Sequence, residues 1–328
     1  MAKTAGLGVL VTGANGYIGR LTVEALAADR SLTARVVALD VRETPKERRL
    51  EGVEYVVDDI RSPELAEILA SYRVDAVVHL ASIVTPGRNS DPEFEYAVDV
   101  LGTRNVLDAC LAAGVRRLVV TSSGAAYGYH ADNPVPLAED APLRGNESFP
   151  YSRHKRLVEN MLAQERRDHP ALAQLVLRPG TILGEGTANQ ITALFKKRVV
   201  LGVRGSETPF VFIWDRDVVR CILRGLREDL SGVYNLAGDG VVTLREIARM
   251  QGRPYLAVPP SLLRGALAVL KRLGLTRYGP EQVDFLRYRP VLANRRLKEA
   301  FGYTPERTSR EVIEAYLAAE RRRTGRAA

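Results

Sequence analysis

The sequence predicts an α/β fold in which a doubly wound, parallel sheet carries a smaller, mostly helical C-terminal lobe. Three observations support this prediction. Strand and helix patterns alternate over the first half, a glycine-rich turn joins the first strand to the first helix, and the pattern loosens after Pro179. Alternating strands and helices are typical of a parallel sheet covered by helices on both faces.

The expected strands of the first half are short apolar runs, at 8–12, 35–39, 53–57, 75–80, 118–122 and 175–178. The run at 75–80 is almost wholly apolar, which indicates a strand buried on both faces. Helical spacing is expected at 21–28, after Pro63, at 94–113 and at 151–167. Gly114 ends the third of these helices, as glycine commonly does.

The second half is expected to hold a loop at 180–186 and strands at 209–213 and 233–236, with helices at 188–197, 215–227, 243–250, 261–273, 294–300 and 309–321. The segment 261–273 is apolar but includes Arg264, Lys271 and Arg272. It could lie on a membrane surface, although an amphipathic helix packed on the core is the commoner arrangement. We expect a sheet domain at 1–182 plus 210–238 and a substrate-binding lobe at 183–209 plus 239–328.

Composition indicates a soluble, cytoplasmic protein. Apolar residues make up 46% of the chain and charged residues 26%, and no apolar run is long enough to span a membrane. The only cysteines, Cys110 and Cys221, suit a reducing compartment, and no signal peptide begins the chain. Two cysteines and four scattered histidines form no metal-ligand cluster, so no metal is expected.

The net charge of +8 is unevenly distributed. Residues 241–328 contain 18 Lys and Arg against 8 Asp and Glu, whereas the first 240 residues have a net charge of −2. No zinc-finger, helix-turn-helix or RNA-binding signature accompanies this charge, so nucleic acid is not an expected partner. An anionic small substrate is compatible with it, because phosphate groups need Arg or Lys partners.

The glycine turn predicts a dinucleotide site of the Rossmann type. Gly13, Gly16 and Gly19 follow the first apolar run and precede a helix. Backbone N–H groups and the helix dipole favour an anion at such a helix N-terminus. Gly13 would permit the tight turn, Gly16 the approach of a pyrophosphate, and Gly19 the contact between helix and strand.

Asp40 stands 21 residues after Gly19, at the end of the second expected strand. A carboxylate there can bind both ribose hydroxyls and repel a 2′-phosphate, so it favours NAD over NADP. Arg42 is the opposing signal, since an arginine near this position can accept a 2′-phosphate.

Ser122 and Ser123 end the fifth strand, and Tyr151 and Lys155 follow on the next long helix. Their spacing of four puts Tyr151 and Lys155 on one helix face. An ammonium beside a phenol is expected to lower the pKa of Tyr151. Tyr151 could then exchange a proton with a substrate hydroxyl while a hydride moves to or from a nicotinamide.

With these motifs, the chain resembles the extended short-chain dehydrogenase/reductase family, in its NAD-dependent epimerase/dehydratase branch. The resemblance runs from about residue 7 to 315. The matching stretches are 12–19, 59–60, 79–82, 102–107, 121–128, 151–155, 177–179, 212–218 and 232–238.

The resemblance implies a role for each matched position. Ser123, Tyr151 and Lys155 would be catalytic. The cofactor-binding set would be Gly13, Gly16, Tyr17, Ile18, Gly19, Asp40, Asp59, Ile60, Leu80, Ala81, Ser82, Tyr151, Lys155, Pro179 and Thr181. NAD would be the cofactor, with NADP less favoured. A homodimer would form through the helices at 94–113 and 151–167.

Three departures limit what the resemblance implies. Gly124 and Ala125 replace the acidic residues of the dehydratases, which disfavours water elimination. Asp99 takes the place of the family's usual asparagine, and the segment 196–212 is shorter than in enzymes of nucleotide sugars. We expect reversible hydride transfer at a secondary alcohol, with a UDP-glucose 4-epimerase-like reaction favoured. A net dehydrogenase or reductase of a hydroxysteroid-like alcohol and a non-catalytic NAD sensor are the alternatives.

Overall fold

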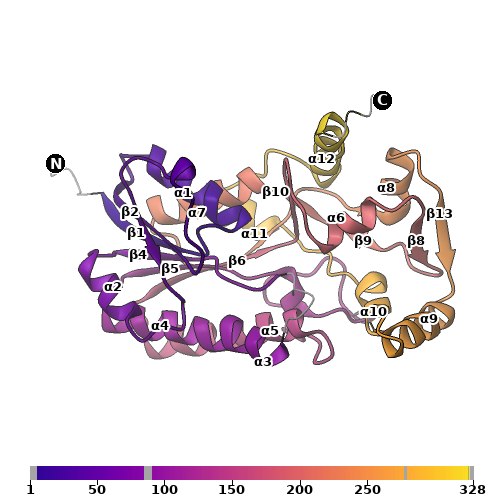
Figure 1. Ribbon diagram of the computed structural model, residues 1–328, viewed down its shortest axis with the longest axis horizontal. Coiled ribbons are helices and arrows are strands. Elements are labelled where there is room, and N and C mark those ends of the chain that lie inside the picture. The colour runs from indigo at the N-terminus through magenta and orange to yellow at the C-terminus, as the bar shows by residue number, and fades with distance from the viewer. Residues whose placement is uncertain (1–5, 85–90, 277–278, 324, 326–328) are drawn as a thin grey trace.

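In the computed structural model, seven strands form one parallel sheet in the order β11-β6-β5-β4-β1-β2-β3 (Figure 1). The structure describes residues 6–84, 91–276, 279–323 and 325. Residues 1–5 and 326–328 of the two predicted domains therefore lie outside it. The predicted doubly wound fold is confirmed. The strands are β1 Leu7–Thr12, β2 Thr33–Asp40, β3 Val53–Val57, β4 Ala76–His79, β5 Arg117–Thr121, β6 Ala173–Pro179 and β11 Gly232–Leu236.

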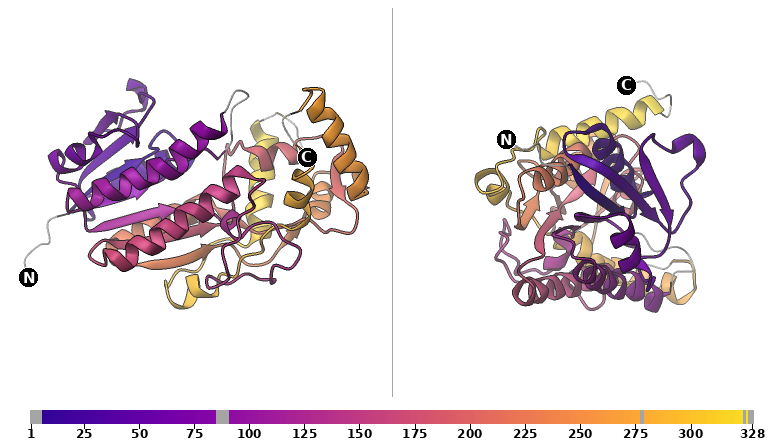
Figure 2. Two further views of the ribbon diagram at one scale, coloured as in Figure 1. Left: turned by 90° about the horizontal axis from the view of Figure 1, so that it is seen from below. Right: turned by 90° about the vertical axis from the view of Figure 1, so that its left-hand side faces the viewer.

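Helices cover both faces of the sheet because alternate strand residues point to opposite sides. In β1, Val9 and Val11 belong to one apolar cluster and Leu10 to the other. The helices α1 (Tyr17–Ala28) and α7 (Asp215–Arg227) cover the first face. The second face carries α2 (Leu65–Ser71), α4 (Gly102–Ala112) and α5 (Pro150–Asp168), with α4 and α5 side by side (Figures 1 and 2).

The expected regular helix at 94–113 is interrupted. It comprises α3 (Pro92–Tyr96), a π-helical turn (Ala97–Leu101) and α4. A Cβ at Gly102 would lie 2.6 Å from the Ile60 side chain, so the helix passes very close to the segment after β3. Wide π turns are frequent at functional sites, and this one contains Asp99.

The smaller lobe combines short helices with three two-stranded pairings. The expected loop at 180–186 is wrong in part, because β7 (Thr181–Leu183) pairs with β10 (Phe212–Trp214). The expected strand at 209–213 is split at Val211, whose carbonyl accepts a hydrogen bond from Thr181 N. The other pairings join β9 (Pro209–Phe210) to β12 (Val242–Thr243) and β8 (Val200–Val203) to β13 (Tyr255–Val258). The helices are α6 Gln190–Phe195, α8 Leu244–Met250, α9 Pro260–Arg272, α10 Gln282–Arg287, α11 Arg295–Glu299 and α12 Ser309–Arg323.

The lobe has an apolar core of its own. Phe195, Phe210 and Phe212 meet there, the last two with stacked rings 5.5 Å apart. Ile213, one residue later, packs in the core of the sheet instead. The chain therefore passes from one core to the other within three residues, close to the predicted boundary at 210, which stays a prediction.

Helix α9 does not pack as an amphipathic core helix, so that expectation is wrong. None of its residues is buried, and Leu262 and Val269 are more than half exposed. Across the described ranges, no helix is both long and apolar enough to cross a bilayer.

Candidate active site

The glycine turn brings β1, β4 and α1 into close backbone contact. Gly13 has a φ of +67°, and a Cβ there would lie 2.7 Å from Ala81 N. A Cβ at Gly19 would lie 2.1 Å from the Gly13 carbonyl oxygen. Helix α1 begins at Tyr17, and no side chain caps its N-cap residue Gly16. The N–H groups of its first turn are thus available for an anion.

Asp40 lies buried beside this turn. Its carboxylate accepts hydrogen bonds from Asn15 N at 2.9 Å, Arg42 N at 3.0 Å and Arg42 Nε at 3.2 Å. Arg42 is thereby drawn to Asp40, although most of its side chain remains exposed. Asp40 therefore holds both the glycine turn and Arg42, the residue that could otherwise accept the 2′-phosphate of NADP.

The next predicted cofactor residues line the same edge of the sheet. Asp59 is paired with Arg61, which holds the pKa of the Asp59 carboxyl below its usual range, and Ile60 is buried. The backbone N–H groups of Leu80 and Ala81 both donate to Thr12 Oγ1. The two bonds to Thr12 tie the end of β4 to the end of β1.

The three predicted catalytic residues come together at the ends of β5 and α5. Ser123 follows β5, and its hydroxyl is near enough to that of Tyr151 to act on the pKa of the phenol. Lys155 is buried one turn further along α5, with Nζ 5.6 Å from the centre of the Tyr151 ring. The spacing of four thus predicted the shared helix face.

The electrostatic expectation for Tyr151 is wrong in this structure. Burial raises the pKa of Tyr151 to about 12, against the lowering by its hydrogen bond to Ser123, and the Asp99 charge raises it further. Lys155 Nζ instead donates to the Thr121 carbonyl, at 3.3 Å. Burial lowers the pKa of Lys155, while Asp99 and Glu159 oppose that shift. The phenol is therefore protonated at neutral pH.

Asp99 stands where the family usually has asparagine, and it lies at the centre of a buried hydrogen-bond network. Its Oδ1 accepts hydrogen bonds from Ser82 Oγ at 3.0 Å and Ile83 N at 2.8 Å. Its Oδ2 lies 3.1 Å from His154 Nδ1, on the residue that precedes Lys155. Ser82, a predicted cofactor residue, is thus linked through Asp99 to the helix that carries Tyr151.

His79 is a structural residue, as its position at a strand end predicts. Its ring lies 2.8 Å from Thr12 Oγ1 and 3.0 Å from Thr103 Oγ1. Burial lowers the pKa of His79 to about 3, so the ring is neutral.

Ser122, the neighbour of Ser123, is hydrogen-bonded to the buried ion pair of Glu159 and Arg178. Its hydroxyl donates to Glu159 Oε1 at 2.5 Å, and Glu159 also accepts two short hydrogen bonds from Arg178 Nε and Nη2, at 2.8 Å and 2.6 Å. Arg178 Nη1 reaches the Tyr127 hydroxyl at 2.7 Å. This buried ion pair could not be predicted from the sequence, because no local pattern links a helix residue to a strand residue 19 positions later.

Arg289 was also missed, and it is an unusual cation, because the residue is half-buried but most of its guanidinium nitrogens are shielded from solvent. Its guanidinium lies 4.2 Å from the ring centre of Phe210 and 4.7 Å from that of Phe285. Nη2 contacts Thr181 Oγ1 at 3.3 Å, while Nε and Nη1 are buried and have no hydrogen-bond partner among the described residues. Burial lowers the pKa of Arg289 to about 10, so it stays charged at neutral pH. In the sequence, the excess of positive charge after residue 240 was the only indication that a cation of the second half could bind an anionic substrate.

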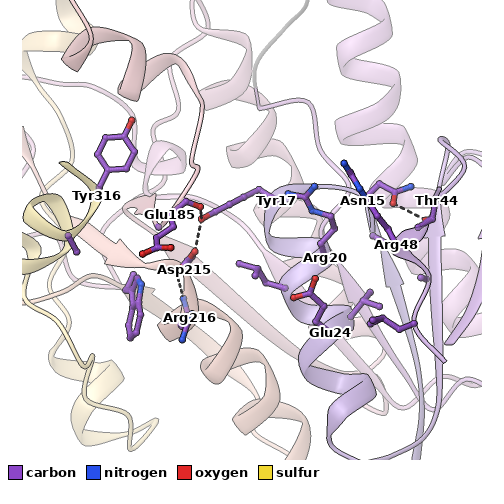
Figure 3. A pocket seen from close by; sticks show the side chains of 18 of the residues that line it. Asn15, Tyr17, Arg20, Glu24, Thr44, Arg48, Glu185, Asp215, Arg216 and Tyr316 are labelled. Atoms are coloured by element: carbon purple, nitrogen blue, oxygen red, sulfur yellow. Dashed lines mark hydrogen bonds between the residues drawn. The ribbon is translucent and has the colours of Figure 1, made fainter. Parts of the chain in front are cut away.

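A groove of about 850 Å³ is lined by residues of α1 and the glycine turn (Figure 3), and Ser123, Tyr151 and Lys155 are not part of its lining. There the Tyr17 hydroxyl donates to Asp215 Oδ2 at 2.5 Å, and burial together with Asp215 raises the pKa of Tyr17. Arginines and carboxylates alternate along this groove, so it has no single sign of charge. They include Arg20, Glu24, Arg48, Glu185 and Arg216.

The turn and the hydroxyl–ammonium group together place the chain among Rossmann-type enzymes that act with a dinucleotide. The sequence profile of the NAD dependent epimerase/dehydratase family matches residues 9–237. The chain belongs to this family, and it is an NAD-dependent enzyme of the extended short-chain dehydrogenase/reductase type.

Individual relatives agree with this assignment. An uncharacterised protein of Mycobacterium tuberculosis (strain ATCC 25618 / H37Rv) is 28% identical over 94% of this chain and 83% of its own length. UDP-glucose 4-epimerase of Azospirillum brasilense is 32% identical over 91% of this chain and 87% of its own. The crystal structure of Thermus thermophilus UDP-glucose 4-epimerase in complex with NAD superimposes with a TM-score of 0.74 at 26% identity, covering 96% of this chain and 99% of that one.

The described residues fit the family's cofactor. A Cβ at Gly13 or Gly19 would collide with backbone atoms, so the close turn that a pyrophosphate needs is built in. Asp40 is positioned beside that turn. Among the residues with a described structure, no cluster of His, Cys, Asp and Glu could hold a metal ion.

Proposed function

We propose that the protein is a nucleotide-sugar 4-epimerase similar to UDP-glucose 4-epimerase. The observation that carries this proposal is Arg289, whose guanidinium has two buried donor nitrogens that lack partners among the described residues. Leaving such donors unsatisfied is costly, and a diphosphate supplies charged acceptors for them. A hydroxysteroid or another uncharged alcohol offers no such group.

Tyr129 supports the position of Arg289 at the substrate end of the site. Arg289 and Tyr151 both act electrostatically on the pKa of Tyr129, so Tyr129 lies within electrostatic range of the cation and of the proposed catalytic tyrosine. Thr181, the polar contact of Arg289, is among the predicted cofactor residues. A diphosphate held at Arg289 would direct the attached sugar toward Tyr151.

In the proposed reaction, the residues of this chain handle the proton and the orientation of the sugar. Tyr151 in its phenolate form takes the proton from the sugar hydroxyl at C4, and the phenol so formed later returns it. The Ser123 hydroxyl, which is near that of Tyr151, would hold the same substrate oxygen. Bound NAD would accept the hydride from C4 and return it to the opposite face. Gly13, Gly16 and Gly19 would hold the pyrophosphate, and Asp40 the adenosine ribose.

The same proposal includes the assembly and location expected from the family. A homodimer would form through α4 and α5, which lie side by side on one face of the sheet (Figure 2), and the enzyme would be cytoplasmic. Light scattering of the purified protein tests the dimer.

The experiment that tests the proposed function is a substrate assay with variants. UDP-glucose and UDP-galactose should interconvert, and Tyr151→Phe should lower kcat by roughly a hundredfold or more. Arg289→Met should weaken UDP-sugar binding by roughly tenfold to a hundredfold, since a charge-assisted hydrogen bond is lost. Arg295→Met, an exposed arginine on α11, serves as the control. Equal UDP-sugar affinity in Arg289→Met and the control would contradict the proposal.

A further inference from the structure

Helix α9 presents its apolar side outward. With 100° between successive residues, Leu262, Val269 and Leu273 fall within one narrow stripe. Each of the three is more than half exposed. On the opposite side of the helix, Arg264 pairs with Asp284 of α10 and Lys271 lies 3.6 Å from Glu281. The side of α9 that faces its own protein therefore carries these paired cations together with the half-buried Leu263 and Leu267, while the stripe of Leu262, Val269 and Leu273 faces outward.

Further exposed aliphatic side chains stand on β8 and β13, which lie with α9 at the end of the lobe farthest from β1 (Figure 1). Leu201 of β8 and Leu256 of β13 are register partners, and about half of each side chain is exposed. We call this surface the apolar end-patch; its residues are Val199, Leu201, Leu256, Leu262, Val269, Leu270, Leu273 and Leu275. Soluble proteins rarely leave so many neighbouring aliphatic side chains exposed without a partner.

The charge around the end-patch is positive. Between Arg253 and Glu281 the sequence contains four cationic side chains and no Asp or Glu. Lys197, Arg198 and Arg272 are exposed, and no ion pair joins them to the described residues. Two copies of this patch would bring like charges together, whereas an anionic surface would attract them.

We propose that the apolar end-patch docks on an anionic lipid surface. Leucine and valine side chains of α9 would enter the boundary between headgroups and acyl chains, while Arg272, Lys197 and Arg198 contact anionic headgroups. None of the described helices could span the bilayer, so the contact is peripheral. This inference is independent of the proposed reaction.

Vesicle sedimentation of the full chain tests the proposal. Vesicles of phosphatidylcholine are compared with vesicles that contain about one third phosphatidylglycerol, at low and high salt. The protein should bind the second kind several-fold more strongly, and high salt should reduce this binding. The double variant Leu262→Gln/Val269→Gln and the variant Arg272→Glu should each reduce it roughly tenfold.

Matched controls change similar side chains elsewhere. Val135→Gln alters an exposed aliphatic side chain in the loop before α5, and Arg295→Glu reverses an exposed charge on α11. Both should bind vesicles like the wild type. Binding that is independent of phosphatidylglycerol, or that persists in the α9 variants, overturns the proposal. If the wild type ignores both vesicles and the α9 variants change a dimer to a monomer in light scattering, the patch is an interface between copies and the proposal is wrong.

Discussion

Asp99 and His154 form a buried pair beside the proposed catalytic residues, with 3.1 Å between Oδ2 and Nδ1. Asp99 comes from a π-helical turn, and His154 precedes Lys155 on α5. The carboxylate also holds Ser82, and its charge raises the pKa of both Tyr151 and Lys155. The departure from the family's asparagine therefore adds a negative charge to the environment of the proposed acid–base group.

Asp99→Asn should shift the pH profile of activity. The amide keeps an acceptor for Ser82 and Ile83, but it removes the negative charge that raises the pKa of Tyr151. The Tyr151 pKa then falls, so the rise of kcat/KM with pH should move to lower pH, by about half a unit to one unit. Asp108→Asn, an exposed carboxylate on α4, should leave the profile unchanged. A shift toward higher pH would contradict this account of Asp99.

Gly19→Ala should impair both folding and cofactor binding. The new Cβ would lie 2.1 Å from the Gly13 carbonyl oxygen, so the turn must move. We expect a loss of about 1–3 kcal/mol in the free energy of unfolding. NAD affinity should fall at least roughly tenfold, because the misplaced turn no longer holds the pyrophosphate.

Gly265→Ala in α9 is the matched control for Gly19→Ala. A Cβ at Gly265 would meet no atom within 4 Å, and Gly265 lies in the interior of helix α9. This variant should be equal to the wild type or more stable by up to about 1 kcal/mol. Denaturant unfolding and calorimetric titration with NAD measure both effects; a Gly19→Ala protein that behaves like Gly265→Ala would refute the close-packing argument.

Glu159→Gln should destabilise the protein strongly. It leaves the buried Arg178 guanidinium without its carboxylate, at an expected cost of about 3–5 kcal/mol in the free energy of unfolding. Arg116→Gln removes the exposed pair with Asp75 and should cost at most about 1 kcal/mol. Urea unfolding measures the loss in the free energy of unfolding for both variants. Similar losses would show that the buried pair of Glu159 and Arg178 stabilises the protein no more than the exposed pair does.

Asp40→Ser should weaken the preference for NAD over NADP. The substitution removes the carboxylate that would repel a 2′-phosphate and frees Arg42 from its bond to Asp40. The ratio of the NADP dissociation constant to the NAD dissociation constant should fall roughly tenfold or more. The reason is that the repulsion of the 2′-phosphate is replaced by an attraction, each worth about 1–3 kcal/mol. If wild-type protein already binds NADP more tightly than NAD, Arg42 rather than Asp40 decides the preference.

The sequence predicted the sheet well because its strands are buried apolar runs with distinct ends. The bounds of Val53–Val57 and of the helix Asp215–Arg227 were predicted as they occur. The spacing of Tyr151 and Lys155 likewise predicted their shared face, because a helix has a fixed period. Local patterns therefore suffice wherever neighbouring residues decide the structure.

Features set by distant contacts escaped prediction. The raised pKa of Tyr151 comes from burial and from Asp99, 52 positions away in the sequence. Arg289 gains its significance from Phe210 and Phe285, which lie on other elements. The outward apolar face of α9 depends on Asp284 of α10 and on Glu281 just before that helix, which hold the charged side of α9 inward.

The most direct test of the proposed reaction is to follow UDP-glucose and the NADH absorbance of the purified protein together. An epimerase returns the hydride to the same sugar, so we expect UDP-galactose to form without net accumulation of NADH, and Tyr151→Phe to slow the conversion by roughly a hundredfold or more. NADH that accumulates in step with an oxidised product, or the absence of any conversion of UDP-sugars by the NAD-loaded wild type, would contradict the account.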